Sequence, residues 1–180
     1  MYGKLRFLAG SRCLGERAIA ATTVLFQRFA GDPGFLPAIR EMRTKLENAE
    51  GGEKNFKTYA GAVYDIDFLV SYLLIKHEVK DKRGTLRDRL WRCVAAGILD
   101  KADAATLDHA AELLRTVEHV VRLVVGRARK WLPATEHARQ VTEDLVSRIL
   151  GRQSPDGLDA ELARVCEEVR RTYDKVLASS

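Results

Sequence analysis

Apolar residues recur along most of the chain at the three- to four-residue spacing of amphipathic helices. The first such pattern spans residues 11–30, and its apolar face consists of Leu14, Ala18, Ala21, Leu25 and Phe29. A second helix is expected to begin at Asp32-Pro33, with Asp32 as its N-cap and Pro33 at the first helical position, and to end near Gly51-Gly52. These two helices are expected to lead into the rest of the domain.

The segment from about residue 62 to residue 79 is apolar on nearly every side, which is typical of a helix at the centre of a bundle. Part of it could form a strand, but its length of about 18 residues exceeds that of an ordinary strand. The next helix is expected to begin at Thr85, where Asp88 completes a pattern that resembles a capping box, and to end near Gly97.

The longest helix is expected to open at Asp100 and Asp103, to keep its apolar repeat as far as Ala128, and to end before Pro133. Two further helices follow, separated by a turn at residues 154–157. No strand-like alternation of useful length interrupts these patterns.

The sequence therefore predicts an all-α bundle of about seven helices in a single domain. The domain is expected to span residues 1–180, with entry helices in 1–55, the core in 56–132 and C-terminal helices in 133–180.

The composition agrees with a folded helical protein, because 46% of the residues are hydrophobic, 31% are charged, and only 4 prolines and 13 glycines interrupt the chain. The net charge is +5, but 25 acidic residues are interspersed among 30 basic ones, which favours a mixed-charge surface over a nucleic-acid footprint. The three cysteines are far apart and form no C-x-x-C pair, so they indicate neither a zinc site nor a disulfide framework. Together with the lack of an apolar run of about 20 residues and of a signal-peptide pattern, this predicts a cytoplasmic protein outside the membrane.

Asp65 and Asp67 place two carboxylates in an otherwise apolar segment. On a strand their side chains would share a face, as in the D-x-D element of a metal-dependent nucleotidyltransferase, whereas on a helix they would point about 200° apart. Such an enzyme also needs a phosphate-binding Gly-Ser turn, but Gly51-Gly52 is followed by a glutamate. We therefore favour two carboxylates near a helix N-terminus, where the helix dipole stabilises each by about 0.3–1 kcal/mol.

Glu118 falls within the apolar stripe of the longest helix, where an unpaired charge would be costly. Arg115 and Arg122 stand three residues before it and four residues after it, so an intrahelical Arg–Glu–Arg network is the favoured interpretation. The alternative is a polar pocket, with His119 beside it, that contacts a partner domain or a ligand. Arg115 and His119 also approach the R-x(4–6)-H element of helical ribonucleases, although the spacing is one residue short.

The remaining candidate groups favour structural roles. The other histidines share no metal-ligand spacing; they are His77, His109 and His137. A basic and aromatic cluster stands at a helix end, where the dipole alone favours cations and nucleic-acid binding is the weaker interpretation; it comprises Arg127, Arg129, Lys130 and Trp131. No Walker loop, G-x-S-x-G or H-E-x-x-H element is present, so no catalytic, cofactor-binding or metal-binding residue is expected in this chain.

Two motifs and their flanking residues carry a resemblance to a known family. A Lys-x-x-x-Gly-Gly-Ile-Arg-Asp-Ile-Glu-Phe-x-x-Gln motif is matched at Lys57, Gly61, Asp65, Ile66, Asp67 (Asp for Glu) and Phe68. A Leu-Arg-x-x-Glu-His-x-x-Gln run is matched at Leu114, Arg115, Glu118 and His119, with Leu132-Pro133 after it and with Arg6, Ala9-Gly10 and Met42-Arg43 upstream. In this order, the chain resembles over nearly its whole length the helical domain of the glutamine synthetase (glutamate–ammonia ligase) adenylyltransferase family, which is related to the helical part of PII uridylyltransferases.

The resemblance implies a helical bundle that follows a nucleotidyltransferase domain. In the full-length family it implies ATP and magnesium as the source of AMP, which is moved to a tyrosine of glutamine synthetase and removed again under nitrogen control. The catalytic Gly-Ser…Asp-x-Asp element belongs to the preceding domain and has no match here. The chain departs from the motifs at Ala62, Tyr64, Ser71 and Arg122. Tyr64 replaces an arginine, which argues against a phosphate-contacting role for this segment.

We therefore expect a non-catalytic helical domain of an adenylyltransferase, which itself holds no cofactor. The expected partner is a nucleotidyltransferase domain, with glutamine synthetase or the PII protein as further candidates, and neither a membrane nor nucleic acid is expected. The residues expected at the seam with that domain are Lys57, Gly61, Asp65, Asp67, Arg115, Glu118 and His119. The alternatives are a stand-alone helical binding or scaffold protein derived from the family, and a helical RNA-binding or RNA-cleaving protein, which predicts salt-sensitive association with RNA.

Overall fold

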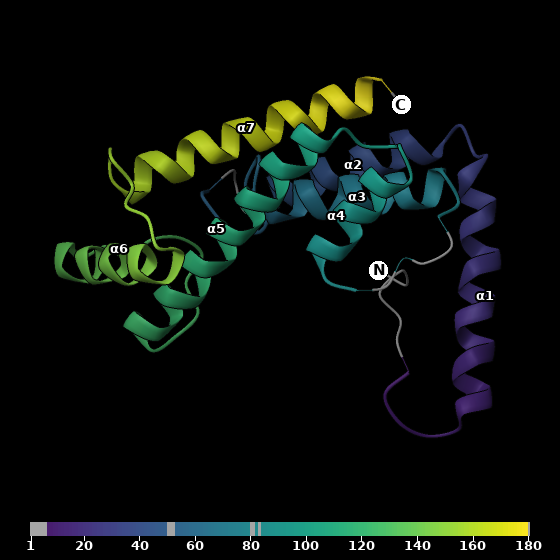
Figure 1. The fold of residues 1–180 in the computed structure, drawn as a ribbon, viewed down its shortest axis with the longest axis horizontal. Helices are drawn as coiled ribbons and strands as arrows, with labels where there is room; N and C mark the ends of the chain where they lie inside the picture. The colour runs from purple at the N-terminus through teal and green to yellow at the C-terminus, as the bar shows by residue number, and fades with distance from the viewer. Residues whose placement is uncertain (1–6, 50–52, 80–81, 83, 180) are drawn as a thin grey trace.

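Seven α-helices and no strand make up the described part of the chain, so the all-α prediction is confirmed (Figure 1). The structure is a computed structural model that describes residues 7–49, 53–79, 82 and 84–179. The helices are α1 (Arg12–Ala30), α2 (Phe35–Asn48), α3 (Val63–Lys76), α4 (Leu86–Ala95), α5 (Lys101–Val125), α6 (Glu136–Leu150) and α7 (Leu158–Ala178). Gly51-Gly52 and Arg6, which the sequence singled out, lie outside the described residues.

Local side-chain chemistry explains where several helices begin. The Thr85 side chain accepts a hydrogen bond from the backbone N–H of Asp88, and the Asp88 carboxylate accepts one from the backbone N–H of Thr85, which completes the predicted capping box of α4. The Asp100 carboxylate accepts a hydrogen bond from the Ala102 N–H at the start of α5.

Two predicted helix boundaries are wrong, each for a local reason. Helix α2 begins at Phe35 rather than at Pro33, because the Asp32 carboxylate accepts a hydrogen bond from the Gly34 N–H and folds these residues into a turn. Helix α5 ends at Val125 rather than near Ala128, because Gly126 takes a left-handed conformation with φ of 72°.

Helix α3 is the centre of the molecule. It contacts α1, α2, α4, α5 and α7, and its buried residues are Val63, Asp65, Ile66, Leu69, Val70, Tyr72, Leu73 and Leu74. Each large apolar side chain buried in this way contributes about 1.5–3 kcal/mol through the hydrophobic effect. The predicted apolar surface of this helix is therefore covered on nearly every side by neighbouring helices.

The outer helices are less enclosed. Helix α7 runs along one side of the molecule and packs against α3 and α5, and α6 packs against α5 at one end of the long axis (Figure 1). Helix α1 stands at the opposite end, packs mainly on α3, and has no buried residue. Among the described residues, no helix combines the length and the apolarity needed to cross a membrane.

Candidate functional site

The two carboxylates of the D-x-D pair lie in the first turns of α3 and face different neighbours. Asp65 is fully buried and accepts hydrogen bonds from Arg43 Nε of α2 and from the Gly61 N–H. Asp67 instead accepts a hydrogen bond of 2.8 Å from Arg89 Nη1 of α4. The strand alternative for this segment is wrong, because the helix turns the two side chains toward separate arginines.

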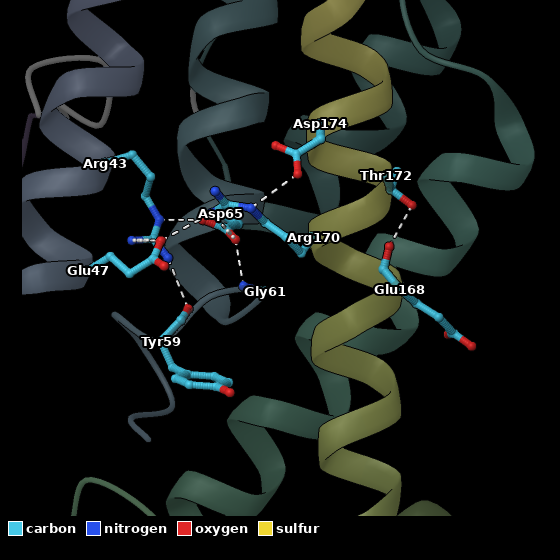
Figure 2. Close-up of polar contacts among 9 residues, drawn as sticks. All are labelled: Arg43, Glu47, Tyr59, Gly61, Asp65, Glu168, Arg170, Thr172 and Asp174. Atoms are coloured by element: carbon cyan, nitrogen blue, oxygen red, sulfur yellow. Dashed lines mark hydrogen bonds and ion pairs between the residues drawn. The ribbon is translucent and has the colours of Figure 1, made fainter. Parts of the chain in front are cut away.

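Asp65 is the buried centre of a group of charges that joins three helices, in which Arg43 is also buried and Arg170 is partly exposed (Figure 2). Gly61 N–H lies 2.6 Å from Asp65 Oδ2, and Arg170 Nη1 of α7 lies 3.4 Å from the same oxygen. The Arg43 guanidinium also donates through Nη2 to the Tyr59 carbonyl at 2.9 Å. Through these contacts, one carboxylate connects α2, α3, α7 and the loop before α3.

Glu47 is a second carboxylate of this group and contacts both arginines. Its Oε2 lies 3.4 Å from Arg43 Nη1 and 3.1 Å from Arg170 Nη1, so two carboxylates face two guanidinium groups. Arg170 Nε also pairs with Asp174 at 3.2 Å, one turn further along α7. Buried ions require this degree of pairing, because each loses several kcal/mol of hydration and regains it only from well-placed partners.

Burial and charge act against each other in this group. Burial raises the pKa of the Asp65 carboxyl, while Arg43, the Gly61 N–H and Arg170 oppose that rise by favouring the ionised form. Burial disfavours the charged form of Arg170, yet its pKa is raised because the carboxylates of Asp65, Asp174 and Glu47 outweigh that effect. The arrangement is that of a structural ion group, with the carboxylate oxygens of Asp65 already occupied by donors.

The residues of the second motif form a separate and more exposed cluster. The carboxylate of Glu118 on α5 forms an ion pair with Lys57 Nζ at 3.0 Å and another with Arg122 Nη2 at 3.5 Å. Arg115 and His119 are exposed on the same helix, and within the described residues Arg115 makes no ion pair with Glu118. The predicted Arg–Glu–Arg network is therefore wrong in one member: Lys57, from the loop before α3, pairs with Glu118 in place of Arg115.

The arginines that bind Asp65 and Asp67 were missed as partners by the sequence reasoning. Arg43 precedes Asp65 by 22 residues and Arg170 follows it by 105, so no local spacing connects them. One signal was available: Arg43 stands between Ile39 and Leu46 on the apolar side of α2, where a cation needs a buried acid.

Asp65 and Asp67 do not fit a magnesium ion of the kind that the family resemblance implies for a full-length enzyme. The carboxylates of Asp65 and Asp67 point to different helices, and each is already bound by an arginine. Among the described residues, no group of three or more His, Cys, Asp or Glu side chains is arranged to hold a metal ion. His77, His119 and His137 are exposed and His109 is half-buried, each at a separate place on the fold.

The departures from the first motif are accommodated by local contacts. Ser71, which stands where the motif has glutamine, accepts a hydrogen bond of 2.7 Å from Arg89 Nη2 and so helps to hold the arginine that binds Asp67. Ala62 is fully buried against the core. The Tyr64 ring contacts the Phe68 ring at a centroid distance of 6.4 Å, so the position that has an arginine in the motif is an aromatic contact here.

Comparisons with known proteins agree with the resemblance found in the sequence. A family profile described as GlnD PII-uridylyltransferase matches residues 38–177. The chain is 31% identical to the bifunctional glutamine synthetase adenylyltransferase/adenylyl-removing enzyme of Streptomyces avermitilis and 32% identical to that of Streptomyces coelicolor; each match covers 96% of this chain and 18% of the relative. A Bradyrhizobium enzyme of the same name is 34% identical, over 77% of this chain and 14% of the relative. The chain thus spans less than a fifth of the length of these relatives.

Proposed function

The chain belongs to the GlnD PII-uridylyltransferase family, and from that premise we propose that it is a non-catalytic helical domain of a glutamine synthetase adenylyltransferase. The curated relatives are named for adenylyl transfer to glutamine synthetase and for its removal. In this proposal, the whole chain acts as one helical domain beside a nucleotidyltransferase domain that supplies the ATP and magnesium chemistry. The bundle shapes the cleft of that domain or relays regulation to it.

The single observation that carries this proposal is the divergence of Asp65 and Asp67. Nucleotidyl transfer by two metal ions requires carboxylates that bridge both ions from one rigid face. Here the two carboxylates bind Arg43 and Arg89, on opposite sides of α3. In this proposal, the Asp65–Asp67 motif has a structural role: it fixes the first turns of the central helix α3 against α2, α4 and α7.

The contact with a partner domain is assigned to the exposed cluster around Glu118. Asp65 and Gly61 lie beneath the surface, so they support the seam from within rather than contact a partner. The side chains of Lys57 and Arg122 are about half exposed, and Arg115 and His119 are exposed. This basic surface suits a partner with an acidic face. The candidates for that partner are the adjoining domain, glutamine synthetase and the PII protein.

A labelling experiment tests the catalytic part of the proposal. The chain is incubated with radiolabelled ATP, magnesium and glutamine synthetase, and the full-length Streptomyces coelicolor relative serves as the positive control. We expect label on glutamine synthetase only with the control enzyme. Robust labelling by this chain alone would overturn the proposal.

A binding experiment tests the seam. The chain is titrated with the catalytic portion of the same relative, and Arg115→Glu is compared with Arg148→Glu, which changes an exposed arginine of α6. Reversal of one charge at a complementary rim should weaken association several-fold and reduce its sensitivity to salt, because one attractive charge pair is lost. Equal affinities for both variants would place the seam elsewhere.

The stand-alone binding protein remains a second candidate, favoured by the aromatic contact of Tyr64 in place of the motif's arginine. The parent coding sequence separates the two candidates. A nucleotidyltransferase domain in frame with this chain supports the first candidate, and its absence supports the second.

A further inference from the structure

The apolar stripe of α1 that the sequence singled out is left largely exposed. Leu14 is 61% exposed, and Leu25 and Phe29 are each 38% exposed. Ala18 and Ala21, which lie between the two leucines, are exposed as well. Contiguous apolar surface of this kind on a folded chain marks a place where another surface binds.

A different face of α1 makes the contact with the body of the molecule. Ile19 and Phe26 are half-buried on that side, about 100° around the helix from the stripe. The helix is thus apolar over about half of its circumference, and α3 covers only one part of that arc. The remaining part is available to a second helix.

Phe29 packs against the ring of Phe35 in α2 at a centroid distance of 5.5 Å, and the other four residues of the stripe read the same in both directions. Leu14, Ala18, Ala21 and Leu25 follow one another at spacings of four, three and four residues, which is the heptad spacing of paired helices. The two large residues stand at the ends and the two small ones at the centre. If a second copy runs antiparallel, Leu14 lies opposite the partner's Leu25, and Ala18 lies opposite the partner's Ala21. Because alanines meet at the centre, the two helix axes can approach closely.

The charges of α1 favour the same orientation. One turn after the stripe, Arg28 continues the heptad position of Ala21. In a parallel pair, Arg28 would face its own copy, and like charges at such a position are destabilising. In the antiparallel pair Arg28 lies opposite the partner's Ser11, so no like charges face each other at this heptad position.

We propose that two copies of this chain associate through the stripe of α1 as an antiparallel, two-fold symmetric helix pair. A self-complementary patch is what a two-fold interface requires, since the same residues must serve on both sides. A contact made by one pair of helices belongs to the class of small interfaces, below about 1,200 Å² in total, which associate weakly. The dimer is accordingly concentration-dependent.

Sedimentation velocity over a concentration series tests the proposal on the intact chain. We expect the mass to rise from monomer toward dimer between the low micromolar range and several hundred micromolar. Leu14→Glu places an unpaired charge against the partner's Leu25 and should weaken the dimer at least about tenfold. Ala20→Glu changes an exposed residue on the opposite side of α1 and should leave the dimer intact. Both variants should melt at the same temperature as the parent, because neither residue is buried in the monomer.

A cross-linking experiment tests the orientation. In a Cys13→Ser background, chains that carry Ala18→Cys are mixed with tagged chains that carry Ala21→Cys and are oxidised gently. The antiparallel register predicts disulfides mainly between the two kinds of chain. Preferential cross-linking of each variant to itself, a dimer unaffected by Leu14→Glu, or a monomer at every concentration would overturn the proposal.

Discussion

A β-carbon at position 61 would lie 1.8 Å from the carbonyl oxygen of Cys166 in α7. Gly61 also has a φ of 77°, which side-chain-bearing residues rarely adopt, and its N–H donates to the Asp65 carboxylate. The backbone of the loop before α3 therefore touches the backbone of α7 directly, next to the buried ion group. The motif's glycine at this position is required by this approach.

Gly61→Ala should destabilise the fold strongly, because two backbone segments must separate to admit the methyl group. We expect a loss of about 2–5 kcal/mol, from the left-handed conformation together with overpacking. Gly97→Ala is the matched control: its φ is 70°, but no atom lies within 4 Å of the added carbon. The control should lose only the conformational share, about 1–2 kcal/mol. Urea unfolding midpoints at unchanged slope measure the difference, and equal midpoints for the two variants would contradict this packing of α7.

The positions of the helices could be predicted from the sequence, whereas the contacts between the helices could not. The capping pattern at Thr85 and the continuous apolar surface of 62–79 depend on neighbouring residues, so periodicity was enough to predict them. The turn at Asp32 also depends on neighbouring residues, but it competes with an N-cap that uses the same side chain.

The contacts of the site could not be predicted because they are distant in sequence. The sequence placed Asp65 in an apolar segment near a helix N-terminus, but finding Arg43 and Arg170 as its partners requires the packing of α2 and α7 against α3. The same holds for Lys57, which is 61 residues from Glu118 and displaces the nearer Arg115. The exposure of the α1 stripe was equally hidden, since an apolar face on a helix does not indicate what covers it.

Asp65→Asn should destabilise the protein by about 3–5 kcal/mol, because it removes the fully buried carboxylate that binds Arg43 and leaves that guanidinium only the partly exposed Glu47 at 3.4 Å. The Arg43 residue is only 1% exposed, so water cannot replace the lost carboxylate. Glu41→Gln removes one partner of the exposed Glu41–Lys45 pair on the same helix and should leave the unfolding midpoint nearly unchanged. Thermal and urea unfolding of the three proteins provide the measurement. A midpoint for Asp65→Asn close to that of the control would show that the buried group contributes little.

The capping box of α4 predicts a dependence of stability on pH. The Thr85 hydroxyl and N–H lower the pKa of Asp88 from its usual 3.8, because both favour the ionised carboxylate. A carboxyl whose pKa is lower in the folded state stabilises the fold above pH 3.8, and this contribution is lost as the pH falls through the folded-state pKa. The stability difference between the parent and Asp88→Asn should therefore shrink below about pH 4. Thr85→Ala should reduce the same pH dependence, and a difference that stays constant down to pH 2 would rule out this role for Asp88.

The three cysteines should differ sharply in reactivity, and one of them reports on α7. Burial raises the pKa of Cys93 to about 11 and that of Cys166 to about 12, whereas Cys13 is exposed. Since the thiolate is the reactive form, a thiol reagent at about pH 8 and low protein concentration should label Cys13 rapidly and the other two only on unfolding. Cys13→Ser should abolish the rapid phase.

Combination with Gly61→Ala makes this measurement local. If the added methyl group lifts α7 from the loop before α3, Cys166 should become reactive before the protein unfolds, while Cys93 in α4 stays protected. Mass spectrometry of labelled peptides distinguishes the two sites. Rapid labelling of Cys166 in the parent protein would mean that α7 is not held over Gly61, and simultaneous labelling of both cysteines in the variant would indicate global rather than local opening.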